Sequence, residues 1–155
     1  YIKSGINIVK EMDKAMTELR KVSNDTTEEL EAFRKESFKI ANTIGSTGKE
    51  IVNSAAGWEK LGYSIKEASE LAKNSALYAN VGDMEINVAT EHMVSALKAF
   101  NVEAVNSIDL VDKMNYVGNR YAITSAGIGE ALERSASSLV AAVKKYLFSV
   151  CLGLT

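Results

Sequence analysis

Hydrophobic residues recur at intervals of three and four along most of the chain, which is the spacing that places side chains on one face of a helix. These intervals predict amphipathic helices at about residues 6–22, 26–44, 47–61, 64–79, 86–100, 108–114 and 128–139. No segment shows a convincing strand pattern of alternating apolar and polar residues. We therefore predict an all-α fold, a multi-helix bundle, in which Val9 and Phe100 are among the inward-facing residues.

The starts and ends of these helices carry local signals. Three of the helices begin with a capping box, in which a Ser or Thr is followed three residues later by Glu. The three pairs are Thr26 with Glu29, Thr47 with Glu50, and Ser64 with Glu67. Breaks are expected at 23–25, at Gly45, at 62–63 and at a turn over 80–83. The chain has no proline, the residue that interrupts helix interiors, which also favours helix throughout.

The amino-acid composition changes near Gly45. Residues 1–45 are dense in charge of both signs and predict a charged amphipathic helical hairpin or coiled coil. Residues 46–142 are richer in Ala, Ser and Gly and predict a compact helical core. The small side chains on its helix faces let the helix axes approach closely. Residues 143–155 form an apolar tail behind Lys144 and Lys145. Two interpretations of this tail stay open, a native segment or a frameshifted end.

Composition narrows the function classes. The formal net charge is −2, so no overall field favours nucleic acid or an anionic membrane. The single cysteine, Cys151, excludes an internal disulfide framework and a multi-thiolate metal site. No uninterrupted apolar run of about 18 residues is present, so no transmembrane helix is predicted. The chain begins with Tyr1 rather than Met, and we expect it to be a fragment.

Candidate catalytic chemistry is sparse. His92, the only histidine, stands beside Glu91 and lacks a second ligand at helical spacing, so we expect a surface or boundary histidine. Gly127-Ile128-Gly129 resembles a phosphate loop only superficially, because no strand precedes it; a loose helix start or close packing is the preferred interpretation. The serines at 135, 137 and 138 have no nearby histidine and no nucleophile-elbow pattern.

The remaining candidates concern binding. Trp58 fits core packing better than base stacking, because no basic stripe accompanies it. Arg120 and Arg134 are expected on the solvated surface, with contact to an acidic partner as the alternative. The segment 144–154 is either a membrane or partner contact or a buried terminal helix. We predict no catalytic, cofactor-binding or metal-binding residue, no cofactor, no enzymatic activity and no direct nucleic-acid site.

Four segments together resemble the core region of phage tail tape measure proteins. The most specific is Ala122-Ile-Thr-Ser-Ala-Gly-Ile-Gly-Glu-Ala-Leu-Glu-Arg-Ser-Ala. The others are Trp58-Glu-Lys-Leu-Gly-Tyr-Ser-Ile-Lys-Glu-Ala-Ser-Glu-Leu-Ala, Asn87-Val-Ala-Thr-Glu-His-Met-Val-Ser-Ala-Leu-Lys-Ala-Phe-Asn and Ser107-Ile-Asp-Leu-Val-Asp-Lys-Met-Asn. They occur in the family's order over somewhat more than half of the chain. The segment Val143-Lys-Lys-Tyr departs from the family, which continues there with a turn and an acidic helix.

This resemblance implies a structural protein of a tailed phage or prophage virion. Tape measure proteins occupy the tail tube during assembly, set tail length and leave ahead of the DNA. The implied partners are other copies of the chain and the tail tube and assembly proteins, in the virion tail and, during assembly, in the host cytoplasm. The chain is short for a whole tape measure, so we expect a piece or a prophage remnant. A helical partner-binding adaptor and a membrane-active helical protein remain the alternatives.

Overall fold

The structure is a computed structural model that describes residues 2–121, 123–135, 138 and 141. Its elements are α1 (Ile2–Arg20), α2 (Thr27–Ile44), α3 (Gly48–Glu59), α4 (Ile65–Gly82), α5 (Ile86–Phe100), the short 3-10 helix η1 (Ala104–Asn106) and α6 (Ser107–Arg120). Residues 125–135 are helical as well. The described residues contain no strand, so the predicted all-α fold is confirmed. The predicted tail at 143–155 lies outside the described residues.

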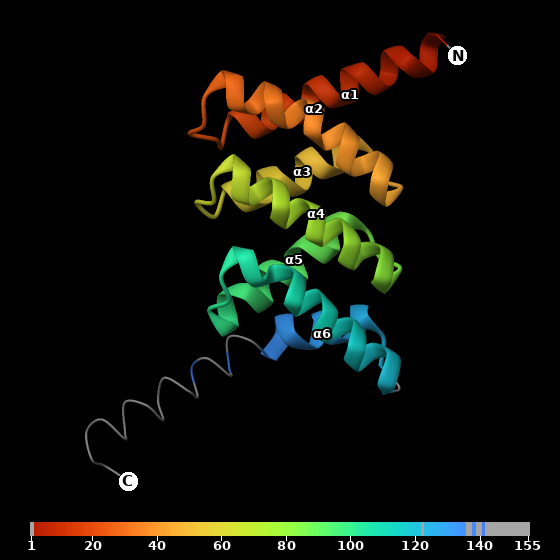
Figure 1. The fold of residues 1–155 in the computed structure, drawn as a ribbon, viewed down its shortest axis with the longest axis vertical. Helices are drawn as coiled ribbons and strands as arrows, with labels where there is room; N and C mark the ends of the chain where they lie inside the picture. The colour runs from red at the N-terminus through yellow and green to blue at the C-terminus, as the bar shows by residue number, and fades with distance from the viewer. Residues whose placement is uncertain (1, 122, 136–137, 139–140, 142–155) are drawn as a thin grey trace, which may run out of the picture.

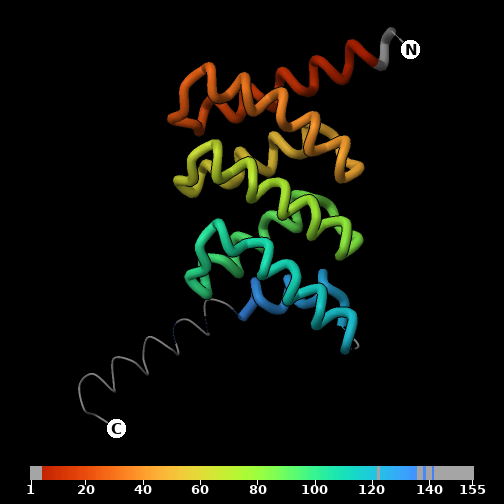
Figure 2. The backbone as a smooth tube through the Cα atoms, viewed as in Figure 1, coloured from red at the N-terminus to blue at the C-terminus, as the bar shows by residue number. Residues whose placement is uncertain are grey.

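Consecutive helices form three hairpins, α1–α2, α3–α4 and α5–α6, stacked one on another (Figure 1). The odd-numbered helices pack in one layer, with α3 between α1 and α5, and the even-numbered helices in a second, with α4 between α2 and α6. The path of the backbone shows that the turns at 21–26, 60–64 and 101–106 lie along one edge of the stack (Figure 2). The turns at 45–47 and 83–85 lie along the opposite edge.

All three predicted capping boxes are present and start α2, α3 and α4. In the second box, Thr47 Oγ1 accepts a hydrogen bond from the Glu50 backbone N–H at 3.3 Å, and Glu50 Oε2 accepts one from the Thr47 N–H at 2.8 Å. These bonds satisfy backbone donors that the first turn of a helix leaves without intrahelical partners. The helix starts were therefore predictable from residues only three positions apart.

The turn predicted over residues 80–83 is wrong in its first three positions. The α4 helix continues through Asn80 to Gly82, and the chain reverses only at Asp83, which has a left-handed backbone (φ 49°). The Asn80 Nδ2 atom also donates to the carbonyl oxygen of Ile44 at 2.7 Å, across to the α2–α3 corner. Asp and Asn tolerate the left-handed region, so a single such residue is enough to end the helix.

One hydrophobic core runs through all three hairpins. Its members include Met12 in α1, Phe33 in α2, Trp58 in α3, Leu71 in α4 and Met114 in α6. Because α3 packs against both α1 and α2, the first hairpin shares this core. Whether residues 1–45 unfold separately from residues 46–142, and whether they form a coiled coil, stay predictions.

Two residues predicted to face inward are exposed. Val9 is 54% exposed, because residues 5–11 of α1 project beyond the rest of the stack (Figure 1). Phe100 is 43% exposed, because it is the last residue of α5, at the edge where the chain turns. Helical periodicity identifies a face of a helix, but it does not show how far the neighbouring helices extend along that face.

We predict that Thr47→Ala lowers the free energy of unfolding by about 1 kcal/mol, because it removes the side chain that caps α3. Thr43→Ala is the matched control, since Thr43 is an exposed threonine near the end of α2 whose hydroxyl bonds only to the carbonyl of Lys39. Alanine has the higher helix propensity, so this control should be neutral or slightly stabilising. Urea denaturation of both variants measures the difference, and equal effects would contradict the capping role.

Candidate partner-binding groove

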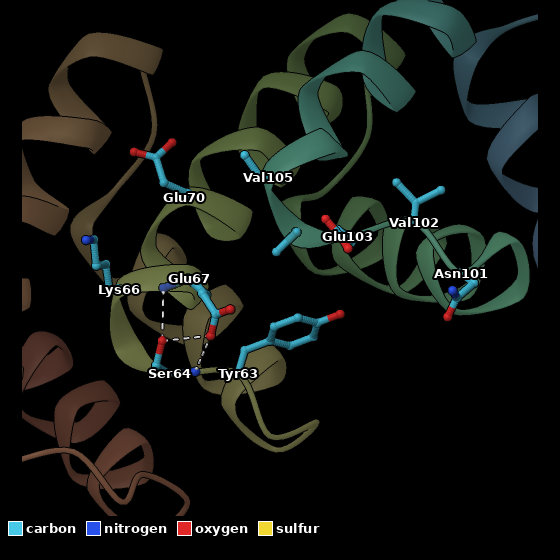
Figure 3. A pocket seen from close by; sticks show the side chains of 10 residues that line it. Tyr63, Ser64, Lys66, Glu67, Glu70, Asn101, Val102, Glu103 and Val105 are labelled. Atoms are coloured by element: carbon cyan, nitrogen blue, oxygen red, sulfur yellow. Dashed lines mark hydrogen bonds between the residues drawn. The ribbon is translucent and has the colours of Figure 1, made fainter.

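A broad hollow lies along the turn edge of the stack, between the second and third hairpins (Figure 3). It has a volume of about 930 Å³. One wall is formed by residues 63–70, the end of the α3–α4 turn and the first turns of α4. The other wall is formed by residues 101–105, the connection after α5 and the start of η1. We call this hollow the 63/105 groove.

The first wall is held rigidly by the start of α4. Glu67 Oε2 accepts hydrogen bonds from the Ser64 backbone N–H at 3.0 Å and from Ser64 Oγ at 2.7 Å (Figure 3). These bonds, that from the Ser64 side chain above all, hold the pKa of the Glu67 carboxyl below its usual range, so it stays ionised. The Tyr63 ring stands edge-on to the fully buried Trp58 ring, with centroids 5.7 Å apart.

The second wall is fixed to α4 by a buried hydrogen bond. Asn101 reverses the chain with a left-handed backbone (φ 52°), and the Val102 N–H donates to the carbonyl of Leu97 at 2.9 Å. Just beyond, Asn74 Nδ2 donates to Ser107 Oγ at 2.8 Å, and both side chains are buried. Because the two walls are tied to the same helix, the width of the groove is set before any ligand arrives.

The groove combines negative charge with apolar surface. Its walls carry Glu67, Glu70 and Glu103 against one cation, Lys66. Glu70 has a solvent-exposed partner at 3.4 Å, the Lys73 ammonium, and such exposed pairs contribute little. No described cation lies within ion-pair distance of Glu103. The groove is suited to binding a positively charged ligand.

The corresponding junction between the first and second hairpins is bridged by a hydrogen bond. Asp25, in the α1–α2 turn, reaches the start of α4, where its Oδ2 accepts a hydrogen bond from the Ile65 N–H at 3.0 Å. Beneath this contact the Glu59 side chain is only 5% exposed. Burial raises the pKa of the Glu59 carboxyl, the Ser23 hydroxyl opposes that shift, and the charge of Asp25 adds to it.

The expectation of a surface or boundary position for His92 is wrong, because His92 is buried. The helical segment 125–135 covers it, and its Nε2 atom lies 3.5 Å from a carboxylate oxygen of Glu133. The Tyr78 hydroxyl beside it donates to the carbonyl oxygen of Ser125 at 2.5 Å, and burial raises the pKa of Tyr78 to about 12. His92 Nδ1 has no hydrogen-bond partner among the described residues.

Of the two interpretations offered for the Gly127–Gly129 segment, the structure supports helix start and close packing. The Gly127 N–H donates to Thr124 Oγ1 at 3.0 Å, which caps the new helix. A Cβ atom at Gly129 would come closer than 3.0 Å to both His92 and Tyr78. Glycine is therefore the residue that lets this helix lie directly on the buried histidine.

Trp58 packs in the core as predicted and is fully buried, with its Nε1–H donating to Ser75 Oγ at 3.3 Å. The two arginines make local, exposed contacts. Arg120 bonds to the Tyr116 hydroxyl at 2.8 Å, and Arg134 pairs with Glu130 at 2.6 Å. None of these three side chains lines the 63/105 groove directly.

The remaining residues considered in the sequence are the serines at 135, 137 and 138 and the tail segment 144–154. The hydroxyls of Ser135 and Ser138 donate to backbone carbonyls of their own helix. Ser137 and the segment 144–154 lie outside the described residues. Across the described part of the chain, no three His, Cys, Asp or Glu side chains are arranged to hold a metal ion. The absence of enzymatic activity stays a prediction.

The groove itself was not predicted from the sequence. Its residues belong to two turns about 40 positions apart, and periodicity does not bring distant turns together. One local signal was available, the pair of valines in Asn101-Val102-Glu103-Ala104-Val105, since apolar residues in a turn are unusual unless they are covered. In the structure Val105 is 78% exposed.

Fold and groove together define a helical-hairpin protein whose described surface offers a place to bind a partner. The family of phage-related minor tail proteins matches residues 34–142, well over half of the chain, and the chain belongs to this family. It is a phage tail structural protein and a component of the virion tail. No solved structure matches the chain. None of the described helices has both the length and the apolar character needed to cross a membrane.

We predict that Gly129→Ala destabilises the protein by about 1–3 kcal/mol, because the added methyl group overpacks the contact with His92 and Tyr78. Gly57→Ala is the matched control. A Cβ there meets only the Thr90 methyl group at 3.7 Å, and Gly57 lies inside α3, so this change should stabilise by up to about 1 kcal/mol. Thermal denaturation compares the two variants. A neutral Gly129→Ala would show that segment 125–135 is not packed as described.

We predict that Glu59→Gln stabilises the protein at pH 7. The folded-state pKa of Glu59 is raised above its usual 4.5, so ionisation opposes folding and its cost is fully present above the folded-state pKa. The gain over wild type should shrink as the pH falls to 4.5 and below, where both states become protonated. Urea denaturation across this range measures it. Glu36→Gln, at an exposed site, should show little effect at either pH, and a pH-independent Glu59→Gln effect would refute the burial argument.

Proposed function

We propose that this chain is the core region of a tail tape measure protein, acting in tail assembly and length determination and extending to genome ejection. The observation that carries the proposal is the family match over residues 34–142. The segment 122–136 supports the finer assignment, because it is the most specific part of the resemblance to the tape measure core. Self-association and contact with tail tube and assembly proteins, first in the host cytoplasm, belong to the same proposal.

The mechanism of a molecular ruler is geometric: the length it measures depends on whether the helices of this region are joined end to end or stacked as hairpins. A continuous helix rises about 1.5 Å per residue. In a stack, neighbouring helices lie only about 8–10 Å apart, so a whole hairpin adds about 10 Å. The end-to-end form gives more length per residue, and we propose that the region measures tail length in that form rather than as stacked hairpins.

A deletion in the intact parent protein tests this proposal. Removing residues 46–83 deletes helices α3 and α4 and the turn between them, so that α2 is followed directly by α5. We expect tails shorter by about 55 Å, the length of the deleted segment as continuous helix. Duplicating the same residues is the matched control and should lengthen tails by the same amount. Electron micrographs of many particles measure both changes.

The outcomes separate the mechanisms. A shift of about 10 Å per hairpin would mean that length is counted in stacked hairpins. Viable particles with unchanged tails in both variants would defeat the ruler. If the deletion blocks assembly, the duplication still tests the graded length.

A helical partner-binding adaptor is the second candidate, and the 63/105 groove is the observation that favours it. For an adaptor, deleting a hairpin abolishes partner capture without any graded effect on length. The membrane-active alternative depends on residues 144–154, which lie outside the described residues.

A further inference from the structure

We propose that the 63/105 groove binds a basic segment of a partner protein, one in which Lys or Arg side chains flank an apolar residue. The proposal does not depend on the tape measure assignment, because it rests only on the shape and charge of the groove. Charge complementarity selects the occupant. The three carboxylates of the groove outnumber Lys66 and the neighbouring Lys73, and this negative balance favours a cationic ligand over phosphate groups.

The start of α4 does not offset this preference. A helix N-terminus attracts anions through its unsatisfied N–H groups. Here the Glu67 N–H is bonded to Ser64 Oγ and the Ile65 N–H to the Asp25 carboxylate. The protein's own oxygens therefore already occupy two of the donors that an anionic ligand would use.

The apolar part of the ligand is accommodated beside Val105. This side chain lines the 63/105 groove and also a second hollow of about 470 Å³, whose apolar residues include Leu77 and Ile108. The exposed Val105 side chain thus stands between the acidic groove and a hollow that apolar residues line together with Glu70, Lys73 and Asn74. A segment crossing Val105 places an apolar side chain against Leu77 and Ile108 and a basic one near Glu103.

The groove is also organised before binding. The capping box fixes the Glu67 carboxylate, the contact with Trp58 fixes the Tyr63 ring, and the bond from Asn74 to Ser107 anchors the opposite wall. Ordering the site on binding therefore costs little free energy, which favours measurable affinity for a short segment.

The test uses fluorescence anisotropy of a labelled peptide, Lys-Leu-Lys-Lys-Val-Lys, with the whole chain. The double variant Glu70→Gln/Glu103→Gln removes two groove charges and leaves the cap residue Glu67 intact. We expect its affinity to fall about fivefold, since exposed ion pairs are individually weak. The control Glu36→Gln/Glu91→Gln changes the net charge equally at exposed sites outside the groove and should bind as wild type does.

A second variant tests the role of Val105. Val105→Ser keeps every charge and, because Val105 is exposed, should fold normally while weakening the same peptide. Loss of affinity in the groove variants but not in the control supports the proposal. Equal losses of affinity in the groove and control variants would mean that binding depends only on net charge, and this would overturn the proposal. Absence of binding to wild type, or equal binding of the peptide with Glu in place of every Lys, would overturn it as well.

Discussion

Burial of apolar side chains between α3 and α4 links the hairpins into one stack. These two helices form the middle hairpin, and between them they contact α1, α2, α5 and α6. Trp58 is the largest side chain in this interface and is fully buried; burying even a smaller apolar side chain such as Leu contributes about 1.5–3 kcal/mol. Its ring also supports Tyr63, so the packing that holds the stack together positions one wall of the 63/105 groove.

The groove follows from how the hairpins are joined. Because consecutive helices alternate in direction, the turns at 21–26, 60–64 and 101–106 meet at one edge (Figure 1). The first of these turns closes onto the next hairpin through Asp25. The third is instead held from beneath by the bond between Asn74 and Ser107, which leaves its outer residues apart from α4. The two junctions thus differ in the polar contact made there: the first turn bonds to the start of α4, and the third adjoins a bond to the middle of α4.

Local and distant interactions explain which features were predictable. The helix starts depend on side chains three residues apart, such as Ser64 and Glu67, and the sequence shows them directly. The position of His92 depends on residues more than 30 positions later, and its own helix carries no sign of that cover. The groove required two separate turns to be placed side by side. What the sequence could not supply was therefore the relative placement of helices rather than the helices themselves.

The apolar contacts between hairpins, more than the polar ones, limit how the stack opens. Ser54 bonds to Thr90 at 2.8 Å and Tyr78 to the carbonyl of Ser125, and water can replace each of these partners when the helices separate. The apolar faces have no such substitute, since side chains such as Met16, Leu71 and Met93 are almost fully buried in the stack. An end-to-end helical form exposes them to water unless another apolar surface covers them. Other copies of the same chain carry such faces, so the proposed extension of this region requires the proposed self-association or another apolar partner.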